Sequence, residues 1–497
     1  MLKKLKINIV SVWECEYDSR IKNDANFATA IKNIRIVEPL DPRKALFGGR
    51  VNALVLDYKV KPGEKIMYLD VVSEYPYVNK NKRYPVGKHK RITNNFKTLD
   101  NYFGIMHCKI LPPRNLMIPI LPAHFDKLIF TLCRTCAEEK NQQVCTHEDP
   151  EQRALTGTWC TLELQEAVKN GYELMEIHEV WHYPDSRERF FADYIDLFLA
   201  LKVQASGWPA DIKTPEQQDA FLDHFFQTEG IRLDGSKISW NPGLRQLAKL
   251  CLNSFWGRLG MRNNLLSTVF VNTVKDFLHY LTSSEFEIHD YDVFSDDVVQ
   301  IMYTRKDAMV PTNPKTNVVL AAFTTAHARL HLLKFMQRAG ERLLYFDTDS
   351  IIFVQRPGDE PFETGSTLGM LSNELAEDDF ITRFCSTGPK SYSYVTASGQ
   401  EVCKIKGFEI NKLTGTVLNF DSMLKIATQP LQDETASDSA HGNVQPESLS
   451  VTYGSTIRRK KRTYEIQDVP MTKRFKKTYD KRRILDDFTT VPYGYVP

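Results

Sequence analysis

Apolar and polar residues alternate over much of the first third of the chain, in a pattern typical of short strands. The runs VNALVLDYKV and EKIMYLDVV are separated by proline-containing connections, and TGTWCTLELQEAV and ELMEIHEVWHYP follow between residues 156 and 184. Alternation bounded by Gly and Pro predicts strands at these positions. Residues 1–50 are interpreted as a short α/β remnant, with a strand at Trp13–Glu16 and a glycine turn at 47–50.

Longer apolar patterns with a period near 3.6 predict helices farther along the chain. They run from Arg189 to Gln204, from Pro242 to about Met261, and from Val318 to Ala339. Asn241 is a candidate N-cap for the second helix. Residues 205–240 form a polar insertion with one internal helix, and RLLYFDTDSIIFVQ predicts two strands joined by a turn. Residues 430–450 are acidic and poor in large apolar groups, so we predict a disordered loop there.

Composition places the 497 residues among ordinary globular proteins, with 42% hydrophobic and 25% charged residues. No run of 18 apolar residues occurs, so a membrane partner is not expected. The net charge of +2 does not by itself indicate nucleic-acid binding. Two basic runs, Arg458–Arg462 and Lys473–Lys477, fit a solvated surface, nuclear import or DNA contact equally well, which leaves the intracellular location open.

Candidate chemistry begins with the turn Tyr345-Phe346-Asp347-Thr348-Asp349-Ser350. Two apolar strands joined by an acidic tip place two carboxylates at an otherwise dry edge. Such carboxylates repel each other and lose hydration, so the tip needs a cation. An Asp-rich hairpin turn without a ligand explains this motif alone equally well.

A second candidate is Asp70, near the end of the apolar strand that begins at Ile66. A lone Asp at a strand end is usually a cap or turn residue, so its significance depends on the residues after it. Ser73 and the local backbone, including Val71, can approach phosphates, and Tyr75 offers a flat ring against a sugar.

The third candidate is the helix LRQLAKLCLNSFWGR. One face carries two cations, an amide and an aromatic ring, at Arg245, Lys249, Asn253 and Trp256. This face suits a triphosphate with a stacked base, and an amphipathic surface helix is the alternative. The opposite stripe, expected to be buried, consists of Leu247, Leu250, Cys251 and Ser254. Combined, aspartates from distant strands could bind two divalent ions for phosphoryl transfer while the helix neutralises the triphosphate.

The order DxxS-x-YP, KxxxNSx-aromatic-G and YxDTDS resembles the A, B and C motifs of family B DNA polymerases. The segment Gly388–Tyr392 resembles the KxY element that contacts the primer strand. The surrounding sequence is most similar to the protein-primed polymerases of viruses and self-synthesising DNA transposons. The stretches that carry this similarity are the FGGR turn, YPYVNKNKRYPVG, GTWCTLEL, FFADYIDLFLALKVQASGWP, KGFEI and PYGY.

The resemblance implies a role for each matching residue. Asp70 and Asp349 would be Mg²⁺ ligands with Asp347 beside them, Tyr75 the gate against ribose, and Asn253 a neighbour of the nascent base pair. The implied triphosphate contacts are Lys249 and Lys202, with Val71 and Ser73 beside the nucleotide. The implied DNA contacts are Gly48, Gly49, Lys390 and Tyr392.

Three positions depart from the family pattern. Glu74 stands where the family prefers Leu, Trp256 where Tyr is usual, and Leu46 where an aromatic residue is frequent. None of them removes a metal ligand. Glu74 affects packing beneath the nucleotide, and Trp256 affects selectivity or fidelity.

Cysteines indicate a second kind of metal site. Cys133-x-x-Cys136 followed by Cys145-x-His147 offers four soft ligands with tetrahedral zinc spacing, in a polar loop that such an ion would hold together. Unpaired buried cysteines are the alternative. Cys160 is an alternative fourth ligand, but its place in an apolar strand favours the core.

The resemblance also implies an α+β right-hand architecture with a mixed-sheet palm, helical fingers and a thumb. Its expected parts are the remnant 1–50, palm segments 51–130 and 317–360, an insertion 131–240 with the zinc knuckle and a terminal-protein-type region, fingers 241–316 and a thumb-like region 361–497. Expected partners are primer-template DNA, dNTPs and a terminal priming protein, with two Mg²⁺ ions as cofactors. No proofreading nuclease is expected, since only about fifty residues precede the matching region.

Two other functional classes stay open at this point. A catalytically inactive, nucleic-acid-binding remnant of a mobile-element polymerase would retain the fold and the basic runs. A reverse transcriptase fits less well, because that class has adjacent aspartates in its hairpin tip, where this chain has Asp-Thr-Asp.

Overall fold

The computed structural model describes residues 11–33, 39–311, 313–429, 448–460, 465–477 and 479–497, which divide into a unit ending at Leu40 and a unit from Asp41 onward. The first unit contains helices α1 (Glu14–Asn23) and α2 (Ala25–Asn33). The strand predicted at Trp13–Glu16 is therefore wrong, because Trp13 is the N-cap of α1. Glu14 and Glu16 lie in the first turn, where the helix dipole stabilises negative charge.

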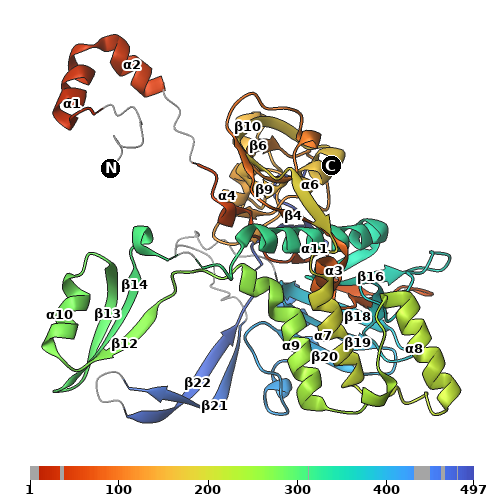
Figure 1. Ribbon diagram of the computed structural model, residues 1–497. Coiled ribbons are helices and arrows are strands. Elements are labelled where there is room, and N and C mark those ends of the chain that lie inside the picture. The colour runs from red at the N-terminus through yellow and green to blue at the C-terminus, as the bar shows by residue number, and fades with distance from the viewer. Residues whose placement is uncertain (1–10, 34–38, 312, 430–447, 461–464, 478) are drawn as a thin grey trace, which may run out of the picture. The chain divides into compact units, whose positions relative to one another are not determined.

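A nine-stranded sheet forms the centre of the second unit (Figure 1). Its strand order is β1 (Val51–Ala53), β15 (Leu343–Asp347), β16 (Ser350–Gln355), β3 (Lys65–Val71), β18 (Ile381–Gly388), β19 (Ser391–Thr396) and β20 (Glu401–Ile405), with β17 (Leu371–Asn373) on β3 and β2 (Asp57–Lys59) on β18. The α+β class is confirmed. The predicted mixed sheet is corrected, because every pairing between these described strands is antiparallel.

Strands β17 to β20, which lie beyond the division expected at residue 361, belong to this central sheet. Helix α12 (Phe420–Ala427) packs its apolar face with Cys385 and Ile405 from the sheet. The hairpin of β21 (Leu449–Arg459) and β22 (Ile466–Phe475) follows, then β23 (Arg483–Ile484) and β24 (Thr490–Val491). Most of the predicted disordered loop, residues 430–447, lies outside the described residues, and β21 already begins at Leu449.

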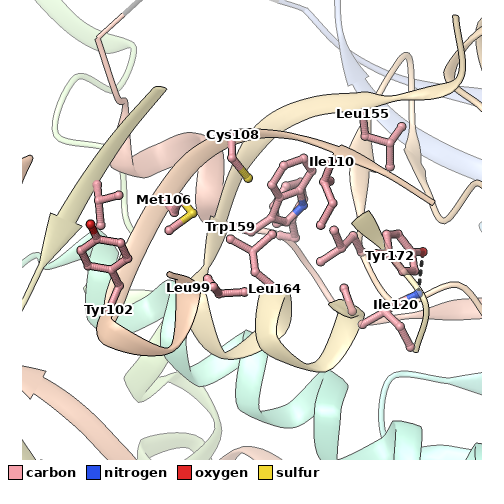
Figure 2. Close-up of a cluster of buried hydrophobic side chains, with 14 of the residues drawn as sticks. Leu99, Tyr102, Met106, Cys108, Ile110, Ile120, Leu155, Trp159, Leu164 and Tyr172 are labelled. Carbon is pink, nitrogen blue, oxygen red and sulfur yellow. Dashed lines mark hydrogen bonds between the residues drawn. The ribbon is translucent and has the colours of Figure 1, made fainter. Parts of the chain in front are cut away.

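A second sheet of four strands has the order β5 (Lys90–Ile92), β10 (Glu173–His182), β6 (Gly104–Leu111) and β9 (Leu155–Cys160). Its core surrounds Trp159 and includes Cys108, Ile110 and Leu164 (Figure 2). The sheet crosses the predicted boundary at residue 131. The strand-rich interpretation of residues 156–168 holds only to Cys160, because helix α6 (Thr161–Lys169) buries Leu164 and Ala167 at helical spacing.

Helix α11 (Val318–Ala339) has the predicted bounds and contributes to both cores. Leu333 packs into the core of the four-stranded sheet, whereas Leu332 and Met336 pack against the central sheet. The helix therefore joins the two sheets through adjacent positions on its surface.

Four helices form a bundle beside the central sheet: α3 (Glu74–Asn81), α7 (Ala192–Gln204), α8 (Pro215–Glu229) and α9 (Pro242–Leu259). A buried lysine connects three of them. Lys80 Nζ lies 2.8 Å from Asp196 Oδ1 and 3.2 Å from Glu229 Oε2. Breaking a buried ion pair leaves an uncompensated charge, so this network ties α3 firmly to α7 and α8.

Residues 267–305 belong to the segment that follows the predicted fingers helix. They form a three-stranded sheet of β12 (Ser267–Val271), β14 (Val298–Arg305) and β13 (Phe286–Ser295), with helix α10 (Val274–Thr282). Smaller elements complete the unit: β4 (Arg83–Val86) with β11 (Asp185–Glu188), β7 (Ala123–His124) with β8 (Leu128–Ile129), and helices α4 (Arg134–Glu138) and α5 (Pro150–Arg153). Among the described helices, none is both long enough and apolar enough to cross a membrane.

Candidate active site

Three aspartates lie at the ends of neighbouring strands in the central sheet. Asp70 on β3 pairs in register with Ser350, the first residue of β16, and Asp347 ends β15. The Val71 amide donates to the carbonyl oxygen of Asp349 over 2.7 Å. The predicted catalytic aspartates are thus brought together by backbone pairing between strands far apart in the sequence.

The electrostatics of this edge show a need for positive charge. Burial raises the pKa of Asp70 to about 7, with added repulsion from the charges of Asp349, Glu374 and Glu74. Burial also raises the pKa of Asp349 to about 6, with added repulsion from Asp347 and Glu74. Hard carboxylate oxygens crowded in this way are the ligands that Mg²⁺ prefers, so the donor set fits divalent ions.

Asp347 differs from the other two aspartates because it has a cationic partner. Lys390 Nζ lies 2.8 Å from Asp347 Oδ1, and the Thr348 hydroxyl donates to the same oxygen over 2.9 Å. The Lys390 backbone amide donates to the Tyr345 hydroxyl over 2.8 Å. The predicted DNA-contacting lysine is therefore attached to the acidic hairpin.

The glycine turn packs directly on the acidic tip. Thr348 adopts a left-handed conformation with φ 58°, and its amide donates to the Arg50 carbonyl over 2.7 Å. A Cβ atom on Gly49 would lie 2.9 Å from Thr348 Cγ2 and 3.2 Å from Thr348 Cα. Gly49 thus permits this close approach, whereas no atom of the described residues lies within 4 Å of a Cβ on Gly48.

A buried ion pair that sequence reasoning missed supports the turn from behind. Arg329 of α11 donates to the carbonyl oxygens of Phe47 and Gly48 over 2.8 and 2.9 Å. The same guanidinium makes two 2.8 Å hydrogen bonds to Glu163 of α6. A single Arg in a helix carries no local signal of this role, because its partners come from separate segments.

The predicted nucleotide-binding residues around α3 lie next to the aspartates. Ser73 precedes α3 in a left-handed conformation with φ 50°, and its side chain does not cap the helix. The Tyr75 ring stacks on Trp256 of α9 at 4.8 Å with an interplanar angle of 23°. Glu74 is buried, and its Oε2 lies 2.8 Å from His331 Nδ1, which partly opposes the burial that raises the pKa of Glu74.

The cations predicted for the triphosphate also gather. Burial lowers the pKa of Lys202, and the charges of Arg245 and Lys249 lower it further. Arg245 Nε donates to Ser206 Oγ over 3.1 Å, which positions its guanidinium beside α7. Lys249 and Asn253 are exposed, so both are accessible to a ligand.

The predicted buried stripe of α9 is wrong. Leu247 and Leu250 are 55% and 58% exposed, whereas Ala248 and Leu252 are buried. Helix α9 packs on α7 through Phe255, whose ring stacks on Tyr194 at 4.4 Å. Leu247 and Leu250 therefore do not lie on the packed face of α9, because contact with α7 buries a different face of the helix.

Tyr392, predicted to contact DNA, lies within a cluster of tyrosines. It is 5% exposed, and its hydroxyl lies 3.1 Å from the Tyr68 hydroxyl. Lys404 Nζ covers both rings, at 5.8 Å from Tyr68 and 5.6 Å from Tyr392. Its contact with DNA stays a prediction, whereas Lys390 is about half exposed and accessible.

A basic hollow of about 360 Å³ lies beside Lys390. Only Arg474 and Lys476 in its wall belong to a basic run that the sequence marked. The other cations are scattered along the chain, and Asp480 is the acidic residue that lines the hollow with them. The six basic residues are Lys127, Lys390, Lys406, Arg474, Lys476 and Lys481.

The four predicted zinc ligands are also brought together. Their ligand atoms lie within 4.8 Å of one another. His147 Nδ1 lies 3.5, 3.3 and 3.6 Å from the sulfurs of Cys133, Cys136 and Cys145. A tetrahedral ion with Zn–S near 2.3 Å and Zn–N near 2.0 Å requires S···N separations of about 3.5 Å, so the group fits zinc. Cys160 is fully buried in β9, as predicted.

Comparison with known sequences identifies relatives of this chain. Residues 41–212 match the sequence model of the family described as DNA polymerase type B, organellar and viral. A protein of Neurospora intermedia named Probable DNA polymerase is 21% identical over 359 residues, covering 70% of this chain and 31% of that protein. A protein of the same name from Podospora anserina is 24% identical over 397 residues, covering 73% and 27%. The chain thus spans less than a third of the length of either relative.

Solved structures show the same fold. Phi29 DNA polymerase complexed with primer-template DNA matches with a TM-score of 0.53 and 14% identity, covering 96% of this chain and 77% of that chain. Its ternary complex with primer-template DNA and incoming nucleotide matches with a TM-score of 0.51, covering 93% and 67%. The likeness confirms the predicted right-hand polymerase fold.

Proposed function

We propose that this chain is a DNA polymerase of the type B organellar and viral family, whose sequence model matches residues 41–212, and that it extends a DNA primer with deoxynucleotides under the direction of a template. One observation carries the proposal. Asp70 on β3 and Asp349 in the turn between β15 and β16 are held side by side by strand pairing, and burial together with neighbouring carboxylates raises the pKa of both.

In this proposal, Asp70 and Asp349 hold two Mg²⁺ ions. When bound, such ions activate the primer hydroxyl and stabilise the leaving pyrophosphate. Lys202, Arg245 and Lys249 neutralise and orient the triphosphate. Their charges already lie close together without a substrate, so binding does not have to assemble them. Tyr75, held by its stack on Trp256, presents its ring where the sugar binds.

The basic hollow is proposed to bind the DNA backbone. Six cations around one space attract phosphates regardless of base sequence. Lys390 connects this hollow to the acidic hairpin through its ion pair with Asp347. A backbone contact there would position the primer end relative to the aspartates.

We extend the proposal to initiation on a protein primer, as part of the replication of a virus-like or mobile element. The support is the sequence similarity of residues 75–87 and 190–209 to the protein-primed branch. Incubation with a labelled dNTP and a candidate terminal protein should yield a labelled protein–nucleotide adduct. An enzyme that extends DNA primers but forms no adduct with its genomic partner would refute this part alone.

We also propose that Cys133, Cys136, Cys145 and His147 bind one structural Zn²⁺. Four protein ligands close a tetrahedral shell and leave no open position for a substrate. Metal analysis of the purified chain should find one zinc per molecule. Zinc absent from protein expressed in zinc-supplemented medium would refute the assignment.

The polymerase proposal is tested by extension of a labelled primer-template with dNTPs and Mg²⁺. The unmutated chain should extend the primer, and Asp349→Asn should not. Asp290→Asn is a matched control, since it changes an exposed aspartate on β13. Failure of the folded, unmutated chain to extend DNA that it binds would favour an inactive nucleic-acid-binding remnant.

A further inference from the structure

The cysteine–histidine group lies against a segment distant from it in sequence, residues 482–496. The carbonyl oxygen of Tyr493 accepts hydrogen bonds from the Leu132 amide over 2.8 Å and from the Thr131 hydroxyl over 3.0 Å. The Tyr493 side chain is 1% exposed and packs in one cluster with the three ligand cysteines. The ligand loop, residues 133–147, and this segment therefore share a small core.

Gly494 shows how close this contact is. Its φ is +86°, and an added Cβ would lie 2.4 Å from Cys133 Cβ and 2.6 Å from the Cys133 amide nitrogen. Two residues farther on, the Val496 amide donates to the Arg114 carbonyl over 2.9 Å. The Arg114 side chain in turn donates to the His147 carbonyl over 2.7 Å. The segment thus contacts one ligand directly and a second through Arg114.

The loop between Cys136 and Cys145 binds the same segment farther along. Gln142 Nε2 donates to the Tyr493 hydroxyl over 3.3 Å, and its Oε1 accepts from the Ile484 amide over 3.0 Å. This loop reads AEEKNQQV, which has too few apolar residues to hold its shape by burial. A metal ion joining its ends would supply the missing constraint.

Residues 480 and 481 extend this segment into the basic hollow, so that the whole segment is 480–496. Asp480 and Lys481 line that hollow, and Asp480 pairs with Lys127 and, at 3.4 Å, with Lys140. Lys127 also lines the hollow and lies just before the first ligand cysteine. One wall of the hollow is therefore made of residues adjoining the ligand loop.

The central sheet holds the middle of the segment. The Thr490 amide donates to the Leu54 carbonyl over 2.7 Å, and the Thr490 hydroxyl donates to the Ala53 carbonyl over 2.7 Å. The chain thus runs from the hollow, past the edge strand of the sheet, to the ligand loop.

We propose that the ion bound by Cys133, Cys136, Cys145 and His147 is a clamp for residues 480–496, and that DNA-backbone binding in the basic hollow depends on it. This inference rests on the structural zinc and on the hollow's affinity for phosphate proposed above. Loss of the ion frees the ligand loop, which releases Tyr493 and shifts Lys127, Asp480 and Lys481 in the wall of the hollow.

The first test compares the zinc-loaded full chain with the same chain after chelation and removal of the chelator. Hydrogen exchange should show lost protection in 480–496 after chelation, with protection in β3 and β16 retained. Affinity for a labelled primer-template without dNTPs should fall about tenfold, as for the loss of one or two phosphate contacts. Re-addition of Zn²⁺, but not Mg²⁺, should restore both.

A variant separates the clamp from the metal itself. Gly494→Ala should keep zinc but displace the segment from Cys133, so DNA affinity should fall while the zinc content stays at one. Gly399→Ala is the matched control, since Gly399 has a similar φ of +85° but no atom of the described residues within 4 Å of its Cβ position. Its zinc content and DNA affinity should both match those of the unmutated chain.

The different failures are distinguishable. Absence of bound zinc overturns both the zinc assignment and the clamp. Bound zinc whose removal changes neither exchange in 480–496 nor DNA affinity overturns the clamp alone. Because binding is measured without synthesis, zinc-dependent DNA binding by a chain that cannot extend a primer supports the clamp and counts only against polymerase activity.

Discussion

Two groups of side chains are proposed to bind metal ions in this chain, and they are built in opposite ways. Asp70 on β3 and Asp349 in the turn between β15 and β16 are distant in sequence, carry hard oxygen ligands and repel each other at the ends of neighbouring strands. Cys133, Cys136, Cys145 and His147 come from one short stretch, carry soft ligands and lie together in a small apolar cluster. In the proposed metal-bound state, the fold holds the first group in place, whereas the second group holds part of the fold together.

This contrast has a physical basis. A rigid antiparallel sheet can keep like charges adjacent, because the strand pairing costs too much to break. A polar loop cannot do this, so a loop site lasts only where the metal itself supplies the binding energy. An open, strained site on a rigid support suits catalysis, and a closed site in a loop suits structure.

The largest expected effect comes from removing one charge at the open site, which Asp70 and Asp349 form. Asp70→Asn or Asp349→Asn should lower primer extension by about 10³-fold or more, since one ligand of the reacting metals is lost. DNA affinity should stay within about twofold. Single-turnover extension and equilibrium DNA binding measure the two effects. Extension within about tenfold of the unmutated chain would disprove the two-metal assignment.

Removal of one ligand from the closed site should act on stability instead. Cys145→Ser should abolish zinc binding and lower the free energy of unfolding by roughly 3–5 kcal/mol, because the loop loses its cross-link. Cys403→Ser, on a partly buried cysteine outside the group, is the control. Denaturant unfolding measures the difference. Equal stability of the two variants would mean that the cysteines are ordinary core residues.

Tyr75→Ala should change how the enzyme discriminates between ribonucleotides and deoxynucleotides. Removing the ring that stacks on Trp256 should reduce discrimination against ribonucleotides by about 10–100-fold, with less effect on deoxynucleotide use. Competitive incorporation of dNTP and NTP gives this ratio. Tyr75→Phe keeps the ring and should leave it unchanged, so equal ratios for all three proteins would reject Tyr75 as the gate.

The smallest effect is the pH dependence of Mg²⁺ binding at Asp70 and Asp349. The folded-state pKa values of Asp70 and Asp349, about 7 and about 6, lie above the ordinary pKa of an aspartate, 3.8. Without metal, their contribution to stability is fully present below about pH 4 and is lost as the pH rises through about 6 to 7.

Mg²⁺ competes with those protons, so its apparent affinity should rise about tenfold between about pH 6 and 8. Thermal unfolding with and without Mg²⁺ measures this linkage. Asp70→Asn should flatten the dependence and Cys145→Ser should not. A Mg²⁺ effect that is the same at both pH values would show that the carboxylates are already ionised at the lower one.

The sequence by itself determined the features that depend on neighbouring residues. Alternation and period predicted β3, the hairpin of β15 and β16, and the bounds of α11. Asn241 caps α9 as predicted, accepting a hydrogen bond from the Leu244 amide. The spacing of Cys133, Cys136, Cys145 and His147 also predicted their proximity, because a short loop brings close ligands together.

The tertiary structure decided the features whose partners are distant. Leu247 and Leu250 are exposed, since α7 packs against another face of α9. Strands β18 to β20 join the central sheet through the pairing of β18 with β2 and with Ile66 of β3, which are distant in sequence. Arg329 with Glu163, and Tyr493 on the ligand loop, depend in the same way on segments that only folding brings together. Local spacing encodes local geometry, whereas the burial of a face and the partner of a charge depend on which surfaces meet.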